Sequence, residues 1–163
     1  MRHATFRRTH CTRGQSGFTM VETLVALVVL TIGLLGIAAL LLKSLQAGRT
    51  ATYRTQAVNL AADLADRIRM NRTAQAAYGT QFDDVAAEVG ACFTTGGCDD
   101  GDLAASDLSR WKDQLAQRLP GGQGQVAVVA PVGAGEPANY TVTVRWVESG
   151  EDQPVTFQLG FAT

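Results

Sequence analysis

A run of nineteen residues, 24–42, contains no charged side chain and no Asn, Gln, His or Pro. As an α-helix, this run would be about 28 Å long, which is close to the thickness of the hydrocarbon core of a bilayer. The run therefore predicts a helix that spans a membrane once. The other parts of the chain of 163 residues are long enough for one small domain and little more.

Positive charge is concentrated before the apolar run. Residues 1–17 carry four arginines and no acid, whereas the remaining residues carry ten bases and fifteen acids. The positive-inside rule therefore predicts a cytoplasmic N-terminus, with the residues after Lys43 outside the cytoplasm. A cleaved secretory signal is the alternative, but its apolar part is usually about 7–15 residues long and ends in small residues, so a retained anchor is favoured. The acidic remainder argues against a nucleic-acid partner.

The distribution of histidine limits the chemistry of the chain. His3 and His10 are the only histidines, and both precede residue 17. If that stretch is removed, a Ser-His-Asp triad, a Cys-His dyad and a histidine metal site are excluded. We therefore expect no catalytic residue, no metal and no cofactor. The rival hypothesis is an envelope enzyme that uses the helix only as an anchor and relies on a histidine-free site such as the acids of residues 99–102.

The residues before the apolar run read Gly17-Phe18-Thr19-Met20-Val21-Glu22. A carboxylate at the head of a membrane-spanning helix is costly without a partner, although it also meets the positive end of the helix dipole. On its own, Glu22 is equally typical of an interfacial residue beside an anchor. The basic leader ending in Gly17, the aromatic Phe18 and the glutamate four residues later together resemble the cleavage site of the type IV pilin and pseudopilin superfamily.

This resemblance implies how the N-terminus is processed. A prepilin peptidase of the inner membrane would cleave after Gly17 and methylate the new amine of Phe18. Glu22 would then pair with an N-terminal amine during filament assembly. Residues 1–17 are accordingly expected to be a leader, and residues 18–43 the transmembrane and assembly half of a long helix.

Apolar residues continue at spacings of mostly three to four after Lys43, which predicts one helix from about residue 18 to about residue 71. Residues 44–72 are expected to form a protruding amphipathic half-helix, with Asp63 and Arg67 as a solvated ion pair. Its apolar stripe must be covered by the C-terminal domain, residues 73–163. The predicted stripe comprises Leu45, Tyr53, Ala57, Leu60, Leu64 and Ile68.

Residues 73–102 are expected to be a surface connection with at most a helical turn at residues 83–89. Cys92 and Cys98 are the only cysteines after the leader. Outside the cytoplasm a disulfide is the leading interpretation, and a metal site is the competing one. The acids of residues 99–102 are interpreted as a solvated turn rather than a calcium site.

A helix at residues 107–119, capped by Ser106, is predicted to bury Leu108, Trp111, Leu115 and Leu119. Alternating apolar residues at 126–129, 140–146 and 155–161 then predict an antiparallel three-stranded meander. The expected fold class is α+β: a long N-terminal helix, membrane-spanning in its first half, packed on a small antiparallel sheet with one additional short helix. The pilin resemblance implies the same lollipop arrangement.

Four elements resemble a narrower group, the PilV type of minor pilins, or type IV pilus modification proteins. They are the helix end at residues 65–72, the loop between Cys92 and Cys98, Trp111 with the break at 119–122, and residues 142–146. The resemblance implies a minor pilin that helps initiate pilus assembly with sibling minor pilins, the major pilin and a tip adhesin. Its domain would be periplasmic, and extracellular after assembly. A minor pseudopilin of a type II secretion system remains the alternative.

Overall fold

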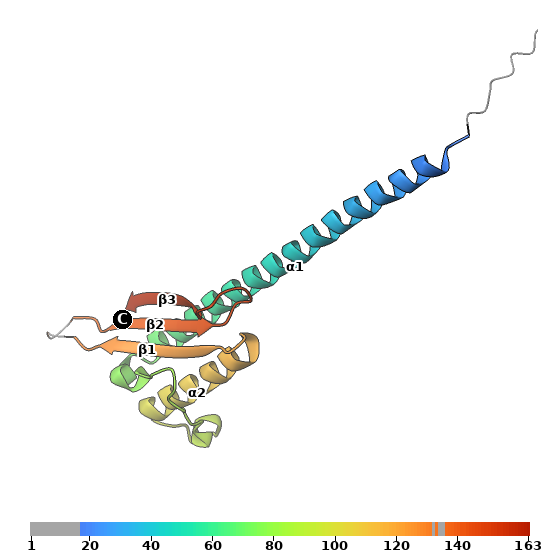
Figure 1. The fold of residues 1–163 in the computed structure, drawn as a ribbon. Helices are drawn as coiled ribbons and strands as arrows, with labels where there is room; N and C mark the ends of the chain where they lie inside the picture. Colours follow the sequence, from blue (N-terminus) through green and yellow to red (C-terminus); the bar gives the residue numbers. More distant parts are fainter. Residues whose placement is uncertain (1–16, 132, 134–135) are drawn as a thin grey trace, which may run out of the picture. The chain divides into compact units, whose positions relative to one another are not determined.

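The computed structural model describes residues 17–131, 133 and 136–163. Most of the expected leader, including His3, His10 and Cys11, lies outside these residues. The chain divides into two units, of which the first ends at Lys43 and the second comprises Ser44–Thr163. Helix α1, Met20–Met70, begins in the first unit and ends in the second (Figure 1).

All the other elements belong to the second unit. Two 3-10 helices, η1 (Arg72–Tyr78) and η2 (Gly90–Phe93), precede α2 (Asp100–Arg118). Strands β1 (Gln123–Val129), β2 (Asn139–Trp146) and β3 (Val155–Ala162) form one antiparallel sheet in the order β1-β2-β3. These elements confirm the predicted fold class of a long helix, one more helix and a three-stranded meander.

The core lies between the second half of α1, the sheet and α2. Alanines alternate with larger residues along the buried stripe of α1, so the other elements can approach its backbone closely. Val142 in the middle strand pairs with Val126 on one side and Leu159 on the other, which places the apolar side chains of all three strands on one face. Residues of the stripe, β2 and α2 are buried together: Ala57, Leu60, Ala61, Leu64, Ile68, Leu108, Trp111, Leu115, Tyr140, Val142, Val144 and Trp146.

The predicted stripe of α1 was wrong at one position. Leu45 is 65% exposed, although it continues the apolar spacing. Contacts with the core begin only at the partly buried Tyr53 and become complete at Ala57. The sheet and α2 are too short to cover α1 further toward its N-terminus, so Leu45 is left in an uncovered turn.

The predicted start of the second helix was also wrong. Helix α2 begins at Asp100, and Asp99 is its N-cap, because Asp99 Oδ1 accepts a hydrogen bond of 2.7 Å from the N–H of Asp102. Carboxylates in this first turn also interact favourably with the helix dipole. Ser106 lies inside α2, is 2% exposed, and its Oγ accepts a hydrogen bond of 2.9 Å from the N–H of Val89.

The predicted surface connection, residues 73–102, has more helix than expected, because η1, η2 and the start of α2 lie within it, whereas residues 83–89 form no helix. Thr80 forms an isolated antiparallel bridge with Val126, with N···O distances of 3.1 and 2.9 Å. Lys112 Nζ donates to the carbonyl oxygens of Gln81 and Asp84, each at 2.6 Å. These bonds attach the connection to α2, and the partial burial of Lys112 lowers its pKa.

The packing of β1 on α2 requires a residue without a side chain at Gly124. A Cβ atom there would lie 2.3 Å from Trp111 Cη2 and 2.6 Å from Leu115 Cδ1. The Trp111 ring cannot easily move, because its Nε1 donates a hydrogen bond of 3.0 Å to the carbonyl oxygen of Leu60 in α1.

We therefore expect Gly124→Ala to lower the free energy of unfolding by about 1–3 kcal/mol. The measurement is denaturant unfolding of the full chain in detergent. Gly160→Ala in β3 is the matched control, because the nearest atom to its added Cβ is 4.0 Å away. We expect this control to change stability by about 0.5 kcal/mol or less. Equal effects of the two substitutions would contradict the close packing at Gly124.

Candidate processing and assembly site

The predicted cleavage residues lie in an accessible segment before α1. Gly17 is exposed, Phe18 is 80% exposed, and regular helix starts only at Met20. A peptidase requires an extended and accessible peptide bond, so the bond between Gly17 and Phe18 is suitably placed for cleavage. Nothing in the described residues covers it.

Thr19 caps α1, a role that the sequence analysis missed. Its Oγ1 accepts a hydrogen bond of 3.3 Å from the N–H of Glu22, and its carbonyl oxygen accepts one of 3.0 Å from the same N–H. The signal was present in the sequence, because a threonine followed three residues later by glutamate is a capping-box pattern. The cap places Glu22 in the first turn of α1, where its carboxylate meets the positive end of the helix dipole.

The Glu22 side chain is exposed and forms no ion pair within the part of the chain described here. In the unprocessed chain the nitrogen of Phe18 is an amide and carries no charge. Cleavage after Gly17 would convert it into an amine, which is largely protonated at neutral pH. The Glu22 carboxylate is therefore available to pair with the positive charge of an N-terminal amine, which only cleavage creates.

The apolar run after Glu22 is uncovered in the single chain. Each of residues 24–42 is exposed, and α1 is long and apolar enough over this stretch to cross a membrane. The hydroxyl of Thr31 donates a hydrogen bond of 2.8 Å to the carbonyl oxygen of Val28, so it needs no partner from water. A continuous apolar surface of this size must be covered by lipid or by other protein segments.

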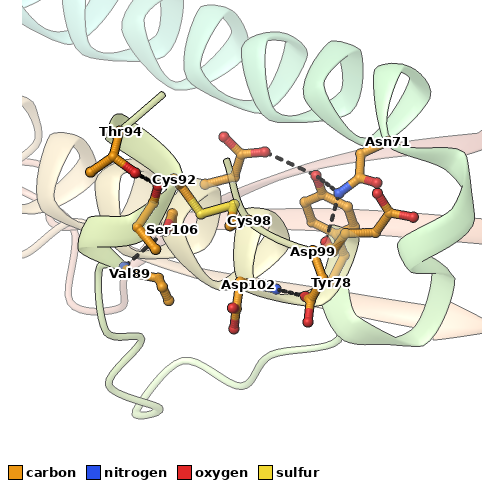
Figure 2. The surroundings of a disulfide bond; sticks show 12 residues. Asn71, Tyr78, Val89, Cys92, Thr94, Cys98, Asp99, Asp102 and Ser106 are labelled. Carbon is orange, nitrogen blue, oxygen red and sulfur yellow. Dashed lines mark hydrogen bonds between the residues drawn. A yellow bond between two sulfur atoms is a disulfide. The ribbon is translucent and has the colours of Figure 1, made fainter. Parts of the chain in front are cut away.

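The expected disulfide joins Cys92 and Cys98 (Figure 2). Within its loop, Thr94 Oγ1 donates a hydrogen bond of 2.8 Å to the carbonyl oxygen of Ala91, and Gly97 has a φ of 71°, a value that favours glycine. The Arg110 guanidinium from α2 lies 3.8 Å from the centroid of the Phe93 ring. The loop is therefore attached to α2 by side-chain contacts as well as by the chain.

The acids of residues 99–102 form the beginning of α2. The Asp99 carboxylate caps the helix, and Asp100 and Asp102 lie in its first turn. Within the described residues, no group of three or more His, Cys, Asp or Glu side chains could hold a metal ion. The predicted solvated turn was therefore wrong, because Asp100 and Asp102 are helical, and the capping function of Asp99 was missed.

A polar cluster connects the end of α1 with η1 and α2. Tyr78 is buried, and its hydroxyl donates a hydrogen bond of 2.9 Å to Asp107 Oδ2. Asn71 Nδ2 donates to the Tyr78 hydroxyl at 3.3 Å and to the carbonyl oxygen of Asp100 at 2.8 Å, as Figure 2 shows in part. Arg67 adds ion pairs of 3.0 Å to Asp63, as predicted, and to Asp107. Burial raises the pKa of Tyr78, so its hydroxyl stays protonated as the donor.

Two comparisons with protein families bear on these segments. Residues 12–38 match the family model of the prokaryotic N-terminal methylation motif, which includes Gly17, Phe18 and Glu22. Residues 39–109 match the model described as type IV pilin Tt1218, which includes the second half of α1 and the disulfide loop. No curated protein and no solved structure matches the chain. The two family matches support the type IV pilin superfamily, a prepilin peptidase substrate and a structural role.

An ion pair connects α1 with the loop after β2, and its acid, Glu148, lies beyond both matched segments. Glu148 has a side chain that is only 4% exposed, and its two carboxylate oxygens accept hydrogen bonds of 3.1 Å from Arg54 Nε and Nη2. Trp146 Nε1 donates a third, of 3.0 Å, to Oε1. The sequence analysis gave Glu148 no role, since only the tertiary fold brings it to Arg54, 94 residues earlier.

The hydrogen bonds from Arg54 hold the pKa of Glu148 below its ordinary value of 4.5, although burial acts in the opposite direction. Between the native and the unfolded pKa, the unfolded state therefore binds more protons than the native state. The contribution of Glu148 to stability is fully present above about pH 4.5 and is lost as the pH falls through the lower native pKa.

We expect the free energy of unfolding of the full chain to decrease below about pH 4.5, and Glu148→Gln to remove part of this decrease. At neutral pH this variant should already be less stable, because it loses a charged acceptor for Arg54. Urea unfolding across this pH range gives the measurement. Asp113→Asn, a change of an exposed acid on α2, is the control and should keep the parental profile. A Glu148→Gln profile that runs parallel to the parent would refute the role of this carboxylate.

Proposed function

We propose that this chain is a minor pilin that helps initiate type IV pilus assembly and is incorporated in the pilus with other minor pilins at its tip. One observation carries the proposal. An exposed bond between Gly17 and Phe18 directly precedes a capped helix that has Glu22 in its first turn and an uncovered apolar run after it. The match of residues 12–38 to the methylation motif supports the pilin-type part of this assignment.

Maturation would begin with the N-terminus in the cytoplasm and the domain in the periplasm, the orientation that the four arginines of residues 1–17 favour. Prepilin peptidase would remove these residues as the leader and methylate the amine of Phe18. Cleavage removes four positive charges and creates one new cation beside the apolar run. This change allows the head of the helix to enter an apolar environment, provided that its charges are paired.

Glu22 would supply the pairing charge. A carboxylate and an amine that neutralise each other lower the cost of burying either group among apolar helices. In the filament, the partner would be the amine of a neighbouring subunit, so correct pairing would also determine the axial position of each helix. The apolar surface of residues 24–42 would then exchange lipid for the equivalent helices of its neighbours.

The choice of a minor pilin rests on the resemblance to the PilV type and on the domain beyond residue 72. In this proposal the sheet and the disulfide loop select the sibling minor pilins, the major pilin and a tip adhesin as partners. A minor pseudopilin would share the processing site and the helix. Capture of the tagged full chain after crosslinking separates the two, because pilus components support a pilin and secretion components support a pseudopilin.

The first test determines the N-terminus of the membrane-extracted chain by mass spectrometry. We expect a chain that begins at Phe18 with a methylated amine in cells that contain an active prepilin peptidase. Cells without the peptidase are the control and should yield the longer form. A chain that begins at Met1 despite an active peptidase would exclude the proposal.

The second test replaces Glu22 with Ala. The variant should be processed normally, whereas its amount in sheared pili should fall roughly tenfold or more, equivalent to about 1.4 kcal/mol or more. Thr23→Ala, a neutral change in the same turn, is the control and should be incorporated like the parent. Normal incorporation of the Glu22→Ala variant would show that the carboxylate has no part in assembly.

A further inference from the structure

A cavity of about 250 Å³ lies where α1 meets two connections of the second unit. From α1 it is lined by Gln46, Arg49, Thr50 and Tyr53, and on the other side by Val147, Ser149 and the turn after α2. The lining therefore combines one cation with hydroxyl and amide groups. Such a set of donors suits an anionic ligand that also accepts hydrogen bonds.

Arg49 is the available cation of this cavity. Its side chain is exposed, and it forms no ion pair within residues 17–131, 133 and 136–163. No acid occurs in the sequence between Glu22 and Asp63, and of the acids in the facing loop, Glu148 is bonded to Arg54. Arg54, one helical turn further on, is by contrast bonded to the buried Glu148.

The wall opposite α1 is held in place by the ion pair between Arg54 and the buried Glu148. Glu148 lies between the two lining residues Val147 and Ser149, and its bonds to Arg54 attach this loop to α1. The N–H of Val147 also donates a hydrogen bond of 2.8 Å to the carbonyl oxygen of Pro120. The loop on this side of the cavity is therefore attached both to α1 and to the turn after α2.

A second hollow, of about 500 Å³, adjoins the first and shares Arg49 and Tyr53 with it. It extends along α1 past Gly48 to the exposed Leu45 and to Ser44. The first hollow thus supplies a cation and hydrogen-bonding groups, and the second adds an apolar residue, Leu45. Tyr53 lies at their junction, and tyrosine is a residue that favours the interface between lipid and water.

The sequence places both hollows close to the predicted membrane surface. Arg49 follows Leu42, the last residue of the apolar run, by seven residues. Even a fully extended chain of that length would reach only about 25 Å. A ligand with a phosphate group and an acyl chain is therefore available where the two hollows lie.

We propose that these hollows bind the headgroup of an anionic phospholipid, with the phosphate at Arg49 and the first acyl carbons along Leu45. A guanidinium binds phosphate oxygens through two parallel hydrogen bonds, and the hydroxyls of Thr50 and Ser149 bind the headgroup. The inference rests on the membrane anchoring in the proposed function. The bound lipid holds the domain at the membrane surface until the subunit enters the filament.

The test measures lipid binding to the processed full chain in mild detergent by native mass spectrometry, with phosphatidylglycerol as the probe. Arg49→Gln should weaken the binding of this lipid roughly tenfold. Arg118→Gln is the matched control, because it removes the same charge from an exposed position at the end of α2 and should leave binding within about twofold. Equal binding by the two variants would overturn the proposal.

Ser149→Glu provides a second variant that does not alter α1. The added negative charge faces the phosphate, so phosphatidylglycerol binding should fall as it does for Arg49→Gln. Phosphatidylcholine should bind more weakly than phosphatidylglycerol to the parent chain, and inorganic phosphate should not displace the lipid. Equal binding of the two lipids, or displacement by phosphate alone, would reject an anionic phospholipid as the ligand.

The N-terminus of each sample separates this inference from the proposed function. A chain that begins at Phe18 but binds the lipid independently of Arg49 would reject the lipid site alone. A chain that begins at Met1 and still binds the lipid through Arg49 would reject the pilin assignment alone.

Discussion

The apolar surface of α1 must be removed from water, and its two halves require different partners. Around Ala57, Leu64 and Ile68 the surface is buried by the sheet and α2, so the chain itself covers it. Along residues 24–42, in the first unit, every side chain is exposed. A membrane or neighbouring helices must cover this half, because a surface of this size is not stable in water. The division explains why one helix can serve both as the core of a domain and as an assembly surface.

Polar contacts then determine how the later elements are arranged on the second half of α1. Arg54 binds the buried Glu148, Leu60 accepts a hydrogen bond from Trp111, and Arg67 binds Asp107. Each contact joins α1 to a part of the chain at least 40 residues away. A small domain buries a limited apolar area, so directional bonds of this kind contribute to a unique arrangement of its elements. The bond between Arg54 and Glu148 also holds the loop that lines the cavity beside Arg49.

Patterns of neighbouring residues correctly predicted the strands and the buried face of α2, because these features depend mainly on local sequence. The alternation of apolar residues in three segments correctly predicted the meander, and the spacing of Leu108, Trp111 and Leu115 correctly predicted the buried face of α2. The predicted start of α2 was wrong. Asp99 and Ser106 are both good N-cap residues, and the local sequence does not show which of them caps the helix and which makes a different contact. Ser106 is taken by the N–H of Val89, a partner 17 residues away.

The sequence by itself determined the long helix, its membrane-like run, the position of Glu22 before that run and the alternation of the strands. These features follow from hydrophobic periodicity and from the cost of placing charge in an apolar environment, both of which act along the chain. Only the tertiary structure decided that Glu148 is buried against Arg54, that Leu45 stays uncovered and that Arg49 faces a cavity. These outcomes depend on where elements distant in sequence meet and how far each extends, and no local pattern carries that information.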